Sequence, residues 1–242
     1  MLSEAARRDP AMLAQFRYER AENEFYPTPT KFLDCLAEHV HLVSKRVWEP
    51  CAGQGHLALR LDELTGQETF CSDLVRYPDH PERLNFAQRV MIADFLLATK
   101  APAGVTAIIT NPPYLTVKIT DEEWLYLKPL AEKYGCINPK TKKVSLAELF
   151  LRHAIELMRP VNGFVAMFLR HEFDCALGRQ DLFTAPFYAG KVTCLERPRW
   201  IEGSTGSPRH NYGWYCFDWR LPEGDPFALY SHPATAKPIT VN

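Results

Sequence analysis

Four consecutive residues near the middle of the chain, Asn111-Pro112-Pro113-Tyr114, combine types that could do chemistry together. They follow residues 105–110, an apolar run typical of a buried strand in a parallel sheet. Because proline has no N–H to donate to a strand ladder, the two prolines end this strand and fix the turn after it. A plain strand-ending turn has the same composition, so the position at a strand's carboxyl end is the informative feature.

This turn is suited to activating an amino nitrogen whose lone pair is delocalised into a ring, as in the exocyclic amino group of a nucleic-acid base. Two acceptors aimed at the hydrogens of such a nitrogen favour a pyramidal geometry and free its lone pair. The amide oxygen of Asn111 and the carbonyl oxygen of Pro112 are two such acceptors, and Pro113 would hold them in place. Tyr114 offers a flat face on which a base taken out of its stack could lie.

A glycine turn lies upstream, where residues 49–55 read Glu-Pro-Cys-Ala-Gly-Gln-Gly between a predicted strand and a predicted helix. Gly53 and Gly55 let the backbone turn tightly and approach a ligand closely. The segment lacks the GxGxxG pattern of dinucleotide sites and the Lys-Ser or Lys-Thr of phosphate loops. Glu49 before the turn suits a cationic ligand instead, such as the ammonium and sulfonium of S-adenosylmethionine. On its own, the turn could equally be a plain strand-to-helix connection.

Two further acids end the next two predicted strands. Asp73 lies about 20 residues after the glycine turn, the spacing at which a carboxylate can meet a ribose diol. Asp94 could accept a hydrogen bond from an adenine amino group, and Phe95 could stack on the ring. Each acid alone is also explained as a helix cap or a solvated turn residue. Three acids at the ends of three successive strands favour a nucleoside-binding edge.

These segments, in their order along the chain, resemble the motifs of the amino-methyltransferases that act on DNA. Residues 49–55 resemble the family's EP-x-A-G-x-G cofactor loop, and residues 93–96, Ala-Asp-Phe-Leu, resemble its adenine-contact motif. Residues 111–114 have the NPPY form of the catalytic motif that is typical of N6-adenine enzymes. Residues 26–29, Tyr-Pro-Thr-Pro, resemble the F/Y-x-T-P motif at the methionine end of the cofactor. The motif order resembles that of the gamma group, and the match covers roughly residues 24–220.

The resemblance implies methyl transfer from S-adenosylmethionine to N6 of an adenine that is flipped out of DNA. Catalysis would rest on Asn111, Pro112, Pro113 and Tyr114. The residues implied in cofactor binding are Tyr26, Thr28, Pro29, Glu49, Pro50, Cys51, Ala52, Gly53, Gly55, Asp73, Asp94 and Phe95.

The elements that must position these motifs alternate along the chain in an α/β manner. Strands are expected at residues 46–48, 68–72, 90–92, 105–110, 163–169, 191–195 and 212–217, and helices at 31–38, 56–61 and 146–158. We therefore expect a Rossmann-like S-adenosylmethionine methyltransferase fold, with a mostly parallel sheet and an antiparallel last strand. Residues 1–22 are expected to form an N-terminal arm, 23–221 the methyltransferase domain and 222–242 a loose C-terminal tail.

Gamma enzymes of restriction systems usually carry a large C-terminal domain that reads the target sequence. Little follows the last expected strand here, so sequence choice would come from loops or be weak. In the link between the last two strands, residues 197–211, Arg197, Arg199 and Arg209 could contact phosphates and Trp200 a base. An ordinary solvated hairpin fits that link equally well. Phe173, after another strand, could offer a second stacking face.

Residues 115–143 form an insertion rich in Lys and Glu, which could close over bound DNA as a lid. Its acidic residues also fit a plain solvated surface. The whole chain of 242 residues has a formal net charge of −1, which argues neither for nor against nucleic acid.

Seven cysteines without a CxxC pair argue against a zinc module and a disulfide framework, so no metal is expected. The N-terminus has no signal-peptide pattern, and no window reaches the ~18 apolar residues of a membrane span. We therefore expect a cytoplasmic protein without a membrane partner.

Other acceptors pose the same problem of a delocalised nitrogen, namely RNA adenine, N4 of cytosine and the side-chain amide of a protein glutamine. Cytosine enzymes more often begin the motif with Ser, and glutamine enzymes usually have a D-x-G-T-G-S-G cofactor loop. Adenine in DNA is therefore favoured. A nucleic-acid-binding module without catalysis would be expected to have lost Asn111 or Gly53, and both are present.

Overall fold

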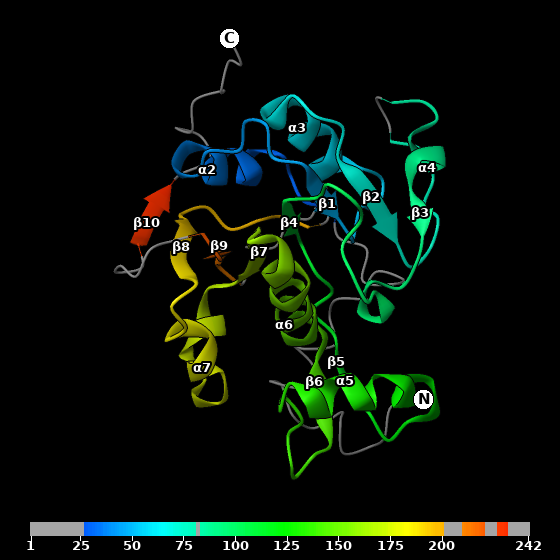
Figure 1. Cartoon of the computed structure of the whole chain (residues 1–242), viewed down its shortest axis with the longest axis vertical. Helices are drawn as coiled ribbons and strands as arrows, with labels where there is room; N and C mark the ends of the chain where they lie inside the picture. The colour runs from blue at the N-terminus through cyan, green and yellow to red at the C-terminus, as the bar shows by residue number, and fades with distance from the viewer. Residues whose placement is uncertain (1–26, 81–82, 201–209, 221–226, 232–242) are drawn as a thin grey trace, which may run out of the picture.

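An eight-stranded sheet with the strand order β10-β8-β9-β7-β4-β1-β2-β3 forms the centre of the computed structural model (Figure 1). The structure describes residues 27–80, 83–200, 210–220 and 227–231. The strands are β1 Val47–Glu49, β2 Phe70–Asp73, β3 Met91–Ile92, β4 Ala107–Thr110, β7 Phe164–Arg170, β8 Tyr188–Cys194, β9 Tyr212–Asp218 and β10 Phe227–Ser231. β9 is antiparallel to both of its neighbours, and every other pair in the sheet is parallel. The prediction of a mostly parallel Rossmann-like sheet is confirmed. The antiparallel strand is β9, at the residues where the last strand was expected, and β10 follows it in parallel with β8.

The helices cover both faces of this sheet (Figure 1). They are α2 Lys31–His39, α3 His56–Thr65, α4 Phe86–Arg89, α5 Lys128–Lys133, α6 Leu146–Met158 and α7 Gln180–Phe183, with short 3-10 helices η3 Phe95–Leu97, η4 Glu122–Leu127, η5 Arg159–Val161, η6 His171–Cys175 and η7 Leu177–Arg179. α2 and α3 pack on one face with one core cluster, and α6 packs on the other with a second. Among the described residues, no helix has the length and apolar character needed to cross a membrane.

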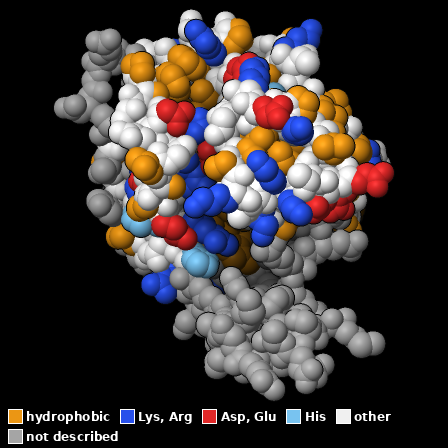
Figure 2. Space-filling view, turned by 90° about the horizontal axis from the view of Figure 1, so that it is seen from below, with side chains coloured by type: hydrophobic (Ala, Val, Ile, Leu, Met, Phe, Trp, Pro, Cys, Tyr) orange, Lys and Arg blue, Asp and Glu red, His pale blue; other side chains and the backbone are white. Residues whose placement is uncertain are grey.

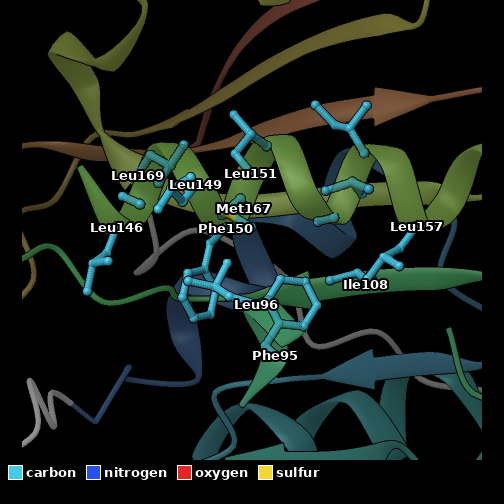
Figure 3. Close-up of a cluster of buried hydrophobic side chains, with 14 of the residues drawn as sticks. Phe95, Leu96, Ile108, Leu146, Leu149, Phe150, Leu151, Leu157, Met167 and Leu169 are labelled. Carbon is cyan, nitrogen blue, oxygen red and sulfur yellow. The ribbon is translucent and has the colours of Figure 1, made fainter. Parts of the chain in front are cut away.

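α6 occupies the residues that the sequence predicts, 146–158, and nearly all of it is buried. Figure 3 shows why: Leu149 and Phe150 point toward Phe95 and Met167, so the helix fills the space between the sheet and η3. This burial includes Glu148, whose carboxylate is compensated by the guanidinium groups of two arginines. The helix therefore fixes the position of the loops that surround the carboxyl ends of the central strands.

Residues 115–145 leave the sheet after β4 and return to it through α6. β5, Thr116–Lys118, and β6, Lys143–Ser145, pair antiparallel in a separate two-stranded ribbon, with η4 and α5 between them. Val117 and Val144 lie opposite each other in this ribbon and are buried in the same core cluster as α6. The apolar side of the ribbon thus anchors it to the body of the protein.

The expected loose tail contains a strand. Residues 227–231 form β10, which pairs in parallel with β8 at the edge of the sheet. Phe227 and Leu229 alternate along the strand and are partly buried against the cluster that α2 and α3 cover. Their spacing of two residues is the signal for a strand, and the expectation of a loose segment was wrong at these positions.

Candidate active site

A cavity of about 430 Å³ opens at the carboxyl ends of β1, β2, β3 and β4. Parallel strands bring these ends to one edge, which is where α/β sheets bind ligands. Most of the residues predicted for the cofactor site and for catalysis line it: Thr28, Pro50, Cys51, Ala52, Gly53, Asp73, Asp94, Phe95, Asn111, Pro112, Pro113 and Tyr114. Pro29, Glu49 and Gly55 do not line it, and Tyr26 lies outside the described residues.

The glycine turn after β1 has the left-handed backbone that its glycines permit. Gly53 has a φ of 51° and its N–H donates to a carboxylate oxygen of Asp73 at 2.8 Å, which ties the first strand end to the second. Gly55 has a φ of 95°, and a Cβ there would lie 2.4 Å from ring carbons of Phe86. Gly55 therefore allows the turn to pack against α4 and stands back from the cavity.

Glu49 at the end of β1 is fully buried. One carboxylate oxygen accepts hydrogen bonds from the Cys51 N–H, at 3.1 Å, and from the Thr110 hydroxyl. The other oxygen, Oε2, has no hydrogen-bond partner among the described residues. Burial raises the pKa of Glu49 to about 8. A buried carboxylate with an unpaired oxygen, under a turn that lines the cavity, is suited to a cationic group.

The two other strand-end acids are held by backbone N–H groups. Burial raises the pKa of Asp73, and the hydrogen bond that its carboxylate accepts from the Gly53 N–H offsets only part of this effect. Asp94 caps η3 by accepting from the Leu96 N–H at 2.9 Å, and its second oxygen accepts from the Tyr126 hydroxyl at 2.9 Å. Asp94 is thus both a cap and part of the cavity wall.

Phe95 lines the cavity but is mainly a core residue. Only 2% of its surface is exposed, and its ring packs against Trp48 and Phe150 with centroids 5.1 and 5.0 Å away. Phe95 is therefore chiefly a core residue, and stacking of its ring on a ligand stays a prediction.

The turn Asn111-Pro112-Pro113-Tyr114 follows β4 directly and is held by hydrogen bonds. The Asn111 side-chain amide donates to the hydroxyl of Thr28 at 2.8 Å, which joins the N-terminal Thr-Pro motif to this turn. The Tyr114 hydroxyl donates to the Asn111 amide oxygen and lies 2.5 Å from the Phe168 carbonyl oxygen. Because an amide oxygen has two lone pairs, the Asn111 oxygen keeps one for a further donor.

The Tyr114 ring belongs to an aromatic group at the ends of β7 and β9. Tyr212 meets it edge-on with centroids 5.5 Å apart, and the Arg170 guanidinium lies 5.9 Å from its centroid. Trp200 packs edge-on against Tyr212 at 5.2 Å. The structure thus connects Trp200, which was predicted to contact DNA, to the Asn-Pro-Pro-Tyr turn through one intervening side chain, Tyr212.

The remaining residues predicted to bind the substrate differ in their exposure. Arg197 and Arg199 are exposed, and Arg197 donates to the Asn211 side chain at 2.6 Å. Arg209 lies outside the described residues. Phe173 is buried, and the Arg179 guanidinium covers its ring at 4.1 Å from the centroid. The prediction that Phe173 offers a stacking face was wrong, because η6 turns this side chain into the core.

Sequence reasoning missed two aromatic residues of the insertion that line the cavity, Trp124 and Tyr126. The prediction for residues 115–143 was based on their lysines and acids. The aromatic side chains of Trp124 and Tyr126, in an otherwise charged segment, could have indicated a buried or ligand-contacting position, because large aromatic residues are uncommon on a plain solvated surface. Tyr126 is hydrogen-bonded to Asp94, so the insertion contacts the third strand end directly.

In the part of the chain that the structure describes, no group of three or more His, Cys, Asp or Glu residues is arranged to hold a metal ion. No protein-family model matches the sequence, and no curated protein matches it. Solved structures do match the fold.

A methyltransferase subunit of a type I restriction-modification system from Streptococcus thermophilus aligns with a TM-score of 0.57 and 17% identity, over 87% of this chain and 48% of the subunit. A protein from Listeria monocytogenes assigned as a class I S-adenosylmethionine-dependent methyltransferase aligns with a TM-score of 0.57 and 10% identity, over 93% and 70%. The chain has the fold of S-adenosylmethionine-dependent methyltransferases.

A third match, from Pyrococcus horikoshii, is a protein assigned as an RNA methyltransferase. It aligns with a TM-score of 0.50 and 15% identity, over 88% of this chain and 98% of that protein. The chain therefore spans about half the length of the type I subunit and nearly the full length of the smaller archaeal protein.

Proposed function

We propose that this protein transfers a methyl group from S-adenosylmethionine to N6 of adenine in DNA. The observation that carries the proposal is the Asn111 side chain, which borders the cavity with its amide held by Thr28 and Tyr114. An amide fixed in this way is a preorganised acceptor for an incoming amino group. The methyltransferase fold and the motif order support the same reading.

The cavity has the features that S-adenosylmethionine needs. The carboxylate of Asp73 lies near the glycine turn, and Glu49, with its unpaired oxygen, can give up its proton when a cation binds; both suit a ligand with an ammonium and a sulfonium. Asp94, with Phe95 beside it, offers an acceptor for an adenine amino group at the other acid-bearing loop. When bound, S-adenosylmethionine supplies an electrophilic methyl group.

The catalytic turn would then act on the acceptor. The Asn111 amide oxygen and the Pro112 carbonyl oxygen accept the two N6 hydrogens, which favours a pyramidal nitrogen with an available lone pair. The nitrogen forms the new N–C bond while the sulfur–methyl bond breaks, and one N6 proton is then lost to solvent. Tyr114 holds the Asn111 oxygen through its hydroxyl, so its role includes positioning as well as contact with the base.

Adenine in DNA is favoured over RNA adenine, cytosine N4 and glutamine because of the NPPY form and the N-terminal Thr-Pro motif. The type I restriction-modification subunit among the similar structures agrees with a DNA substrate, and the archaeal RNA methyltransferase keeps RNA as the second candidate. A base within duplex DNA would have to be flipped out to reach a turn at the edge of the sheet.

The proposal is tested by incubating the protein with radiolabelled S-adenosylmethionine and, separately, unmethylated duplex DNA, single-stranded DNA, RNA and a glutamine-containing protein. We expect label in duplex DNA and its loss in Asn111→Ala. Asn162→Gly is the matched control, because Asn162 is exposed in a left-handed turn that glycine also adopts. Label in RNA alone or in protein alone would identify that polymer, and not DNA, as the substrate. Failure to bind the cofactor in calorimetry would overturn the proposal.

A further inference from the structure

The β5–β6 ribbon begins two residues after the catalytic turn. Lys118 and Lys143 are direct cross-strand partners in this ribbon, next to the buried pair of Val117 and Val144. Side chains alternate between the two faces of a strand, so the two lysines lie on the face opposite the valines, and both are exposed. The ribbon therefore holds two positive charges side by side on its outer face.

Such a pair is unfavourable unless an anion lies over it. Like charges that are directly opposite each other on antiparallel strands destabilise the pairing. Two more exposed lysines, Lys140 and Lys142, lie in the connection that enters β6, where the Asn138 side chain accepts from the Lys140 N–H at 3.0 Å. The backbone of Lys142 is left-handed, with a φ of 56°. The turn thus concentrates positive charge at the end of the ribbon.

None of these four lysines forms an ion pair with a described residue, whereas other lysines of the same insertion do. On α5, Lys128 lies 3.8 Å from Glu132, and Lys133 is paired with Glu156. Glu132 of the insertion and Glu156 of α6 thus compensate α5, and neither is paired with the ribbon. Figure 2 views the molecule from below, the side on which Figure 1 places β5 and β6, and shows several Lys and Arg side chains on this face, with Asp and Glu side chains among them.

We propose that Lys118, Lys140, Lys142 and Lys143, here called the lysine ribbon, bind the phosphate backbone of duplex DNA beside the catalytic turn. The inference rests on the proposed function for the identity of its partner. A row of exposed lysines carries charge without the fixed donor geometry that reads base edges, so it fits a phosphate backbone. The ribbon would hold DNA in register with Asn111 and contribute affinity independent of sequence.

The test is the salt dependence of binding to unmethylated duplex DNA, measured by fluorescence anisotropy without cofactor. The variant is Lys118→Gln with Lys143→Gln. The matched control is Lys128→Gln with Lys133→Gln, which removes the same number of charges from the same insertion. Each phosphate contact contributes about 0.9 to the slope of log affinity against log salt. We expect the ribbon variant to lower that slope by about 2 and to weaken binding at least tenfold at about 50 mM salt.

Two outcomes would overturn the inference. A ribbon variant and a control with the same slope would overturn it, as would a wild-type chain that does not bind duplex DNA. The ribbon variant is expected to unfold at the same temperature as the wild type or higher, because it loses a like-charge pair. A wild type that binds DNA with the expected slope but transfers no methyl group would contradict the proposed function and leave the ribbon's role standing.

Discussion

Glu49→Gln is the substitution that bears most directly on why an ionisable carboxyl group is buried at the end of β1. Glu49 is fully buried, and Oε2 of its carboxylate has no hydrogen-bond partner among the described residues. Burial raises its pKa from the ordinary value of 4.5 to about 8, and the hydrogen bonds from Thr110 and Cys51 offset only part of this effect. We infer that this group is kept, although its burial lowers stability, because it binds a cation.

The magnitude follows from the two pKa values. Between about pH 4.5 and pH 8 the folded chain keeps a proton on Glu49 that the unfolded chain has lost. The raised pKa therefore favours folding fully below about pH 4.5, and this advantage is lost as pH rises toward 8. One pKa unit corresponds to about 1.4 kcal/mol. From about pH 5 to about pH 9, Glu49 should lower the free energy of unfolding by on the order of 4 kcal/mol.

Glutamine does not titrate, so the variant should escape this loss. Urea unfolding of both proteins at about pH 5 and about pH 9 measures it: the free energy of unfolding of Glu49→Gln, relative to wild type, should rise by on the order of 4 kcal/mol. Calorimetry at neutral pH should find at least tenfold weaker binding of S-adenosylmethionine to the variant, and proton release on binding to the wild type only. A stability difference that does not change with pH would refute the reasoning.

Three further substitutions test separate parts of the site. Gly55→Ala should lower the free energy of unfolding by about 2–3 kcal/mol in urea denaturation, because its Cβ meets the Phe86 ring and its φ is 95°; wild-type stability would contradict this. Tyr126→Phe removes a hydrogen bond of about 1 kcal/mol to Asp94 and should weaken cofactor binding about fivefold, as measured by calorimetry. Unchanged affinity would show that the insertion is not part of the cofactor site. Glu148→Gln breaks a buried ion-pair network with Arg152 and Arg179 and should lower the free energy of unfolding by about 3 kcal/mol in urea denaturation. A loss under about 1 kcal/mol would show that the two arginines compensate for the missing carboxylate.

The centre of the parallel sheet was predictable because β1, β4 and β7 are buried on both faces and are mostly apolar. The run at 105–110 became β4, and the helical period at 146–158 became α6 without a shift of either end. The strand-end motifs were predictable for a related reason. Each lies where an apolar run stops, and parallel strands bring those points to one edge.

Aromatic residues were the main source of error, since burial and ligand contact favour the same side chains. Phe95 and Phe173 were both predicted to stack on a ring, and both are chiefly core residues. Trp124 and Tyr126 were overlooked, and both line the cavity. Which aromatic ring is exposed depends on packing between segments far apart in the chain, such as Phe95 against Trp48 and Phe150, and the local sequence does not reveal this packing.

Glu49 illustrates a second limit. The sequence places an acid before the glycine turn and predicts a cationic ligand, which requires only its type and position. It does not reveal that Thr110, from a different strand, takes one carboxylate oxygen and leaves the other unpaired. β10 was missed because its apolar alternation extends over only Phe227 and Leu229.

The most direct test of the central claim is the nucleoside composition of genomic DNA from a host that lacks adenine methylation and expresses this protein. Mass spectrometry of the digested DNA should detect N6-methyldeoxyadenosine with the wild type and none with Asn111→Ala produced at the same level. Methylcytosine in place of methyladenine, or methyladenine that persists in Asn111→Ala, would contradict the role assigned to the catalytic turn.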